Sequence, residues 1–219
     1  FGAKGDGITD NTQFINRIIE ACSLRGGGTV IIPEGTFLTG SILLKSKVNL
    51  FLESNAVVKG INNLEKYRSI SDLNQEAYYK VKPRNWNKAL LLGDQVEGVS
   101  ITGEGVIDGA HIQDKKGEEG MRGPHILFLS RSKGIKISGV KLRRASNYAF
   151  MSYDIERASF DNLLVEEGWD GIHIRGGKDI RIRNCRFYTG DDAVAGGLWK
   201  NMVIENCYMN SSCNGIRLI

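Results

Sequence analysis

A repeat of 22 or 23 residues in the second half of the chain constrains the fold more than any other feature. Four segments of alternating apolar and polar residues align, and their third positions recur at that spacing: Ile137, Phe160, Ile182 and Ile204. Such columns require a chain that returns to the same place about every 22 residues. Because the segments are short and are separated by turn residues, we expect a β-solenoid rather than a helical array.

The repeat also predicts what fills the interior of the solenoid. In-register strands of successive coils lie about 4.8 Å apart, and we expect one interior column to hold Val140, Leu163, Cys185 and Cys207. The two cysteines are expected to be reduced, since adjacent in-register strands seldom suit disulfide geometry. A column of asparagines should satisfy turn amides through side-chain hydrogen bonds, and it consists of Asn162, Asn184 and Asn206.

One helix is expected near the N-terminus. Apolar side chains recur there with helical period at Phe14, Ile15, Ile18, Ile19 and Cys22. Residues 11–24 are therefore predicted to form an amphipathic helix whose apolar stripe faces the core. Asp10 and Gln13 resemble a capping box at its start.

Two segments interrupt the repeat. Residues 61–90 are too long for a turn and contain four aromatic residues, Tyr67, Tyr78, Tyr79 and Trp86. Residues 110–124 are rich in charge. Segments of this kind often line a binding groove on one side of a solenoid, although a charged segment such as 110–124 is equally typical of a solvated loop.

Charge and composition exclude several classes of function. Lys and Arg number 29 against 25 for Asp and Glu, a formal net charge of +4, which is too mild and too dispersed for a dedicated nucleic-acid binder. No apolar run approaches membrane-spanning length. The four cysteines are too few for a disulfide framework and lack zinc-site spacing. We therefore expect neither a nucleic-acid nor a membrane partner. The expectation is also that the protein uses no metal or other cofactor, with calcium at the carboxylates described below as the alternative.

The length of 219 residues suits one domain of ordinary size. The last six residues, Asn214 to Ile219, stop within a strand-like pattern, and Phe1 is not preceded by a charged and hydrophobic leader. The expectation is a single β-helix domain over residues 1–219, truncated at the C-terminus, with any signal peptide absent from this chain.

Acidic residues recur with the repeat at one edge of the second strand of each coil. The residues ten places after the four aligned positions are Asn147, Asp170, Asp192 and Asn214. Asp191 directly precedes Asp192, so three carboxylates are expected within a few ångströms. Like charges so close disfavour joint ionisation. One carboxyl can then donate a proton while its neighbours stay ionised, which is the arrangement that glycosidic hydrolysis needs.

Alternation along the next strand predicts what surrounds these carboxylates. Ile172 and Ile174 should point inward, so His173, Arg175 and Arg217 should point outward onto the face that the acids border. The arginines suit an acidic polymer but could also be ordinary surface charges. Three carboxylates also form a donor set that calcium prefers, so at this point a metal site remains an alternative.

The chain resembles glycoside hydrolase family 28, the polygalacturonases and their relatives that hydrolyse pectin. The resemblance covers essentially the whole chain and is carried by four segments, Phe1–Thr12, Ile101–Gly109, Trp169–His173 and Thr189–Ala193. It implies a right-handed parallel β-helix with an N-terminal capping helix, which is an all-β fold.

The resemblance also implies roles for individual residues. Asp191 would be the general acid, and Asp170 and Asp192 would hold and activate the attacking water, with inversion at the anomeric carbon. Inversion calls for about 6.5–9.5 Å between acid and base carboxyls, which one coil rise plus a side-chain offset could supply. The predicted substrate-binding residues are Trp169, as a platform for a sugar ring, Arg217, as a carboxylate-binding cation, His173 and Asn214.

The chain departs from the family pattern at two positions of the site. Asn214 stands where the family has a histidine, and Gly168 and Trp169 replace an Asn-Thr pair. Members that cleave rhamnogalacturonan also lack parts of these two motifs.

The resulting expectation is a monomeric, secreted or periplasmic inverting glycosidase that acts on galacturonic acid linkages in pectin, an acidic plant polysaccharide. The alternatives are a rhamnogalacturonan hydrolase on the same fold, a calcium-dependent polysaccharide lyase, and a non-catalytic glycan-binding β-helix, the last suggested by Asn214.

Overall fold

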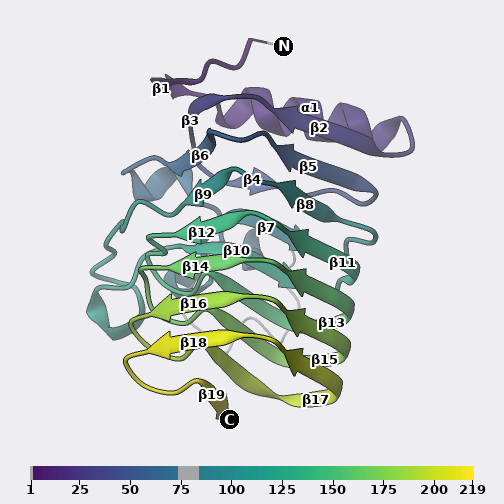
Figure 1. Cartoon of the computed structure of the whole chain (residues 1–219). Coiled ribbons are helices and arrows are strands. Elements are labelled where there is room, and N and C mark those ends of the chain that lie inside the picture. The colour runs from purple at the N-terminus through teal and green to yellow at the C-terminus, as the bar shows by residue number, and fades with distance from the viewer. Residues whose placement is uncertain (1, 74–83) are drawn as a thin grey trace.

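The computed structural model of the protein describes residues 2–73 and 84–219, and all pairings between its named strands are parallel. The strand register matches the sequence repeat. Ile137 pairs with Phe160, Phe160 with Ile182, and Ile182 with Ile204. The predicted β-solenoid is therefore confirmed (Figure 1).

Two sheets form the walls of the solenoid. The eight-stranded sheet contains, in spatial order, β1 (Asp6–Asp10), β3 (Gly35–Thr39), β6 (Ala56–Gly60), β9 (Val106–Asp108), β12 (Lys141–Arg143), β14 (Leu164–Glu166), β16 (Arg186–Thr189) and β18 (Tyr208–Ser211).

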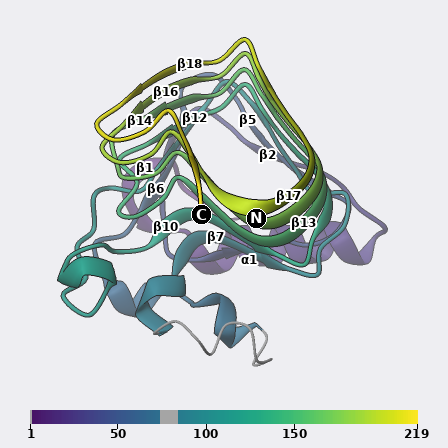
Figure 2. The same ribbon diagram turned by 90° about the horizontal axis from the view of Figure 1, so that it is seen from below.

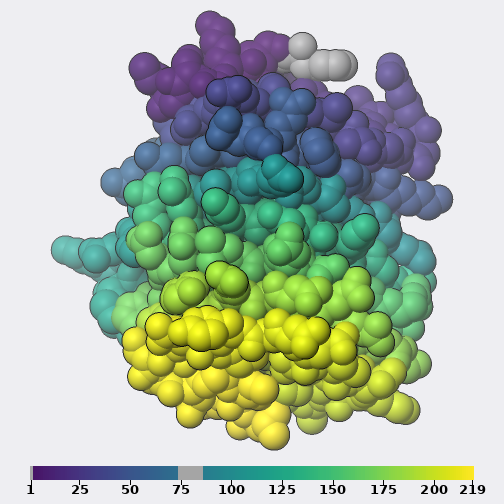
Figure 3. Space-filling view, viewed as in Figure 1, coloured from purple at the N-terminus to yellow at the C-terminus, as the bar shows by residue number. Residues whose placement is uncertain are grey.

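The eleven-stranded sheet consists of a main path and three further strands. The main path contains β2 (Gly28–Ile32), β5 (Val48–Leu52), β8 (Ser100–Gly103), β11 (Lys133–Ser138), β13 (Phe150–Asp161), β15 (Ile172–Arg183), β17 (Val194–Glu205) and β19 (Ile216–Leu218). Beside it lie β4 (Ile42–Leu43), β7 (Ala89–Asp94) and β10 (His125–Ser130). The coils follow one another along the solenoid axis from the N- to the C-terminus, so their side chains cover the surface in ordered rows (Figure 3).

Helix α1 (Thr12–Leu24) covers the N-terminal end of the solenoid (Figure 1) and buries Ile15 and Ile19. The predicted helix is confirmed, but the predicted capping box is wrong. The helix N-cap is Asn11, whose side chain makes no capping hydrogen bond. Asp10 instead forms an ion pair of 2.8 Å with Lys66, and its Oδ1 accepts a hydrogen bond from the Thr12 amide.

The interior column is filled largely as predicted. Val140, Leu163 and Cys185 are buried, whereas Cys207 is only partly buried, and both cysteines are free thiols. Burial raises the pKa of the Cys185 thiol to about 12, so this side chain behaves as a small apolar group.

The asparagine column serves the turns through its backbone conformation. Asn162, Asn184 and Asn206 all have φ between 52° and 55°, the left-handed region that asparagine adopts more readily than most residues. The backbone amides of Asn162 and Asn184 donate to the next coil. The Asn184 side chain bonds to the Asp161 carboxylate at 2.9 Å, rather than to a turn amide as expected.

Two excursions leave the solenoid on the same side (Figure 2). The first, residues 61–88, contains three 3₁₀ helices within its described parts, η1 (Leu64–Lys66), η2 (Ile70–Asp72) and η4 (Arg84–Asn87). The second, residues 110–124, contains η5 (Glu118–Gly120). Lys88 and Asp114 join the two excursions by a buried ion pair of 3.8 Å. Tyr67 is buried, while Tyr78 and Tyr79 lie outside the described residues.

In residues 2–73 and 84–219, no helix combines the length and apolar character needed to cross a membrane.

Candidate active site

The structure brings together the three aspartates that the sequence singles out. One carboxylate oxygen from each of Asp170, Asp191 and Asp192 lies within 4.8 Å of the others. Asp170 and Asp192 are buried, and the side chain of Asp191 is 21% exposed. Asp191 is therefore the carboxylate of the three that solvent reaches most readily.

The backbone ladder that positions these residues corrects the predicted column by one residue. The backbone amides of Gly171 and Ala193 donate to the backbone carbonyls of Asp192 and Asn214 in the following coil. The Ala149 amide donates to the Asp170 carbonyl in the same way. The residue equivalent to Asp170 one coil earlier is thus Tyr148, not Asn147. The connection from β12 to β13 is one residue longer than that from β14 to β15, which the repeat in the sequence does not reveal.

Asp170 is held by a histidine whose tautomer the contacts define. The Arg175 Nε–H donates to His173 Nε2 at 3.1 Å, so that ring nitrogen must be an acceptor. His173 Nδ1 therefore carries the proton and donates it to Asp170 Oδ2 at 2.7 Å. The backbone amide of Asp192 donates to the other oxygen of Asp170 at 3.2 Å.

The environment of His173 differs from the expected open face. The imidazole lies outside the solenoid interior, yet it is buried and stacks on the Tyr148 ring, with centroids 4.8 Å apart and planes 6° apart. The excursions and the aromatic side chains beside them cover this part of the sheet, which alternation along a strand cannot predict. The contacts of His173 favour orienting Asp170 over touching a substrate.

Asp192 is held from the following coil. Asn214 donates to Asp192 Oδ1 through its backbone amide at 3.2 Å and through its side chain at 2.7 Å. Arg217 Nη1 lies 3.4 Å from Asp192 Oδ2, and the Arg217 side chain is 55% exposed. The structure thus places both predicted residues at the carboxylates, and both are exposed.

Arg122, which sequence reasoning did not single out, supplies the cation beside Asp191. Its Nη2 lies 3.0 Å from Asp191 Oδ2, and its guanidinium lies 4.1 Å from the centroid of the Trp169 ring. Burial lowers the pKa of Arg122, but the hydrogen bond to Asp191 and the nearby Tyr148 and Glu119 outweigh burial and raise it overall. The charged character of residues 110–124 could be seen in the sequence, but the path that brings Arg122 to the aspartates could not.

A second layer of polar contacts fixes the excursions to the solenoid. Glu118 Oε2 accepts hydrogen bonds from the Tyr148 hydroxyl and the Asn147 side chain, both at 3.2 Å. His125 Nδ1 accepts from the Tyr148 amide, so its Nε2–H donates to the Trp86 carbonyl at 2.9 Å. Burial lowers the pKa of His125 to about 4, which keeps this histidine neutral at physiological pH.

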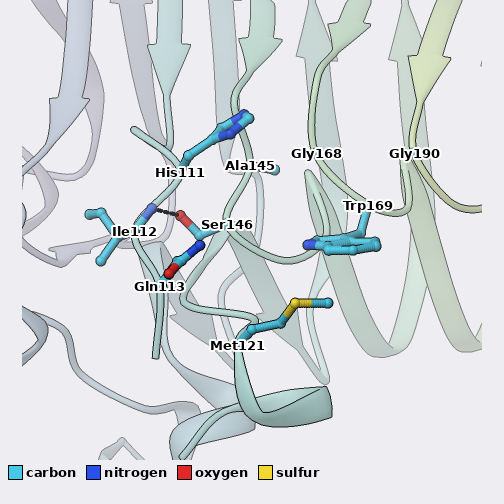
Figure 4. A pocket seen from close by; sticks show the side chains of 9 residues that line it. All are labelled: His111, Ile112, Gln113, Met121, Ala145, Ser146, Gly168, Trp169 and Gly190. Atoms are coloured by element: carbon cyan, nitrogen blue, oxygen red, sulfur yellow. Dashed lines mark hydrogen bonds between the residues drawn. The ribbon is translucent and has the colours of Figure 1, made fainter. Parts of the chain in front are cut away.

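A cavity adjoins the carboxylates between the second excursion and the coils (Figure 4). Trp169 and Gly190, the residues before Asp170 and Asp191, lie on its wall together with Met121 and Ile112. In the view of Figure 4, Trp169 and Met121 lie to the right of Ile112 and Gln113 among the lining residues. No lysine or arginine is among its lining residues within the described chain.

A parallel β-helix with aspartates clustered where successive strands begin defines the class of pectinase-like β-helix proteins. The chain belongs to the family described as rhamnogalacturonase A/epimerase, pectate lyase-like, whose sequence model matches residues 1–217.

Individual relatives agree with this assignment. A polygalacturonase of Prunus persica is 26% identical over 209 residues, covering 90% of this chain and 49% of the relative. The family 28 exopolygalacturonase of Yersinia enterocolitica superimposes with a TM-score of 0.77 at 19% identity, over 100% of this chain and 54% of that one. PfbA, a surface adhesin of Streptococcus pneumoniae, superimposes with a TM-score of 0.75 at 20% identity, over 100% of this chain and 57% of the adhesin. The resemblance to family 28 and the fold class are thereby confirmed.

Proposed function

We propose that this chain carries the active site of a pectin-degrading glycoside hydrolase that cleaves galacturonic acid linkages with inversion. The observation that supports this most strongly is the gathering of Asp170, Asp191 and Asp192 on adjacent coils, in a chain related to a polygalacturonase. Because the substrate is an extracellular polymer, the proposal includes a secreted or periplasmic location, and it takes the protein to be a monomer.

The environments of the three aspartates suit a division of roles. Asp191 is the most exposed of them and is proposed as the general acid that protonates the leaving glycosidic oxygen. Asp170 and Asp192 are buried and fixed by protein donors, and they are proposed to orient the attacking water and take its proton. Water then adds to the anomeric carbon as the glycosidic bond breaks.

The carboxylate separation differs from the expected one. The nearest oxygens lie within 4.8 Å, shorter than the roughly 6.5–9.5 Å associated with inversion. The proposed acid, Asp191, directly precedes Asp192 in the chain and lies one coil away from Asp170, so the chain connection and the interstrand spacing keep it close to both. The proposed inversion therefore rests on the family resemblance, and proton NMR of the first-formed product anomer tests it directly.

The contacts favour hydrolysis over a calcium-dependent lyase. The oxygens of the three carboxylates already accept hydrogen bonds from His173, Asn214 and Arg122. A calcium ion bound by these oxygens would have to displace such donors and would lie beside the positive charge of Arg122.

A rhamnogalacturonan hydrolase is the second candidate, and the cavity beside Trp169 favours it. The lining of that cavity includes apolar and uncharged side chains such as Ile112, Met121 and Ser146. Such a lining suits the apolar face of an uncharged sugar better than a uronate.

The test follows reducing ends and ultraviolet absorbance in parallel on polygalacturonate and rhamnogalacturonan I. New reducing ends without absorbance support hydrolysis and identify the backbone that is cleaved. Absorbance from an unsaturated product, lost in chelator, would support the lyase instead. Binding to either polymer without new reducing ends would support a glycan-binding β-helix, a function suggested by the structural likeness to an adhesin and by Asn214.

A further inference from the structure

We propose that Arg122 is a binding site for the carboxylate of an acidic sugar, and that Glu119 occupies this site in the free protein. This inference rests on the proposed function, because it takes from that function that the ligand is an acidic oligosaccharide. Arg122 donates through Nε to Glu119 Oε2 at 3.0 Å, and its Nη2 lies 2.9 Å from Glu119 Oε1. This two-point contact is the geometry with which a guanidinium recognises a free carboxylate.

The cation of this pair is fixed, whereas the anion is exchangeable. The Arg122 side chain is 5% exposed and the Glu119 side chain 52%. Arg122 is held by Asp191 and by the Trp169 ring as well as by Glu119. A soluble carboxylate can therefore replace that of Glu119 without moving the guanidinium.

Releasing Glu119 would leave the excursion in place. The neighbouring Glu118 anchors the segment separately, through Asn147 and the Tyr148 hydroxyl. Glu119 itself has a left-handed backbone, with φ 55° and ψ 16°, which costs free energy in a residue other than glycine. The Glu119 contact is thus a replaceable part of the excursion.

The location of Arg122 explains what the contact would do for a substrate. A uronate carries the same carboxylate group as Glu119, and at this position it would lie beside Asp191, the proposed general acid. With Asp191 protonated as the general acid, Asp170 and Asp192 still repel a negatively charged sugar, and Arg122 offsets that repulsion where the sugar binds. A methyl-esterified sugar has no such charge and would gain little from Arg122.

The test compares the wild-type protein with Glu119→Gln, which removes the charge of the occupant but keeps its size. We expect the KM for oligogalacturonides to fall by about fivefold, the scale of an exposed ion pair, with kcat unchanged. The KM for methyl-esterified oligomers should stay the same. Ile8→Ala, an 83% exposed position in the first strand, is the control and should change neither constant.

A binding measurement separates this inference from the proposed function. Calorimetric titration with trigalacturonate is made in Asp170→Asn, a change that does not touch Arg122, with and without Glu119→Gln. If the wild type releases no reducing ends but Glu119→Gln still tightens binding, the proposed function fails and the carboxylate site stands. If hydrolysis is present and Glu119→Gln changes neither KM nor trigalacturonate affinity, the inference is overturned. Failure of trigalacturonate to bind any variant overturns it as well.

Discussion

Asp191 and Asp192 are neighbours in the chain, yet they have different surroundings. Asp192 is buried beneath Asn214 and close to Arg217, whereas Asp191 contacts Arg122 and is partly open to solvent. Substituting Asp191 by Asn keeps the shape of the side chain and removes the transferable proton. We expect kcat to fall by at least about a hundredfold, with an unchanged circular dichroism spectrum.

The matched control is Asp179→Asn, on the outer face of β15, where the carboxylate contacts the exposed side chains of Asn201 and Lys178. It should retain full turnover. Normal activity in Asp191→Asn would remove the proposed role of Asp191 as general acid.

A separate prediction concerns His173, whose buried ring contacts Asp170 and Tyr148 and does not line the cavity beside Trp169. His173→Phe preserves stacking on Tyr148 but loses the proton donor to Asp170. We expect kcat to fall by about tenfold or more, the effect of one hydrogen bond to a charged group, with KM within about twofold of the wild-type value.

His173→Asn can still place a donor near the position of Nδ1, so it should recover part of the lost kcat. A role for His173 in substrate binding would instead raise KM in both variants. Kinetics on oligogalacturonides distinguish these outcomes.

At the residue scale, the sequence predicts some parts of the site and not others. Asp170 and Asp192 could be placed together because both follow the repeat, and Asp191 is adjacent in the chain. Tyr148 could not be placed beside them, because the connection from β12 to β13 has one extra residue that shifts its register. Arg122 and Glu119 lie in an excursion whose path no repeat constrains, so their contacts with the site have no periodic signal.

At the element scale, His125 in β10 links the first excursion to the solenoid through the Trp86 carbonyl and the Tyr148 amide. Burial lowers the pKa of His125 to about 4, from an ordinary value of 6.5. The folded protein therefore holds this histidine neutral, while the unfolded chain binds a proton below about pH 6.5. The resulting stabilisation is present above pH 6.5 and is lost as the pH falls towards 4, by about 3 kcal/mol in total.

This prediction is checked by urea unfolding between pH 7 and pH 4. The unfolding free energy of His125→Asn should decrease less over this pH range than that of the wild type. His111→Asn, a substitution at a half-exposed histidine, should keep the full decrease. Equal pH dependence in the wild type and His125→Asn would contradict the argument.

The elements themselves could be predicted to different degrees. The strands with period-two alternation and the helix with its apolar stripe were predictable from local pattern, because burial on one face determines both patterns. The capping box was wrong because Asp10 bonds to Lys66, a residue distant in sequence. The 3₁₀ turns of the excursions have no comparable periodicity.

At the scale of the whole molecule, the coils share one interior. The larger cluster of buried apolar residues runs from Ile15 in α1 to Val194 in β17. A second, smaller cluster, which includes Ile70, Phe128 and Tyr148, draws on β7, β10 and β13 as well. Because these strands contribute to both clusters, we expect the two to unfold together. We expect thermal unfolding as one cooperative transition, with a calorimetric enthalpy close to the van't Hoff enthalpy. Two resolved transitions in scanning calorimetry would argue against a single domain over residues 1–219.

The backbone ladder through Gly171 and Ala193 has a consequence for how such a site can change over generations. Asp170 and Asp192 are separated by one coil, and the hydrogen bonds between strands fix that distance. Mutation can therefore alter it only in whole coils, not by small increments. A lineage built on this framework must acquire new preferences for its ligands by remodelling the segments outside the coils, where residues can be gained or lost without disturbing the stacked strands.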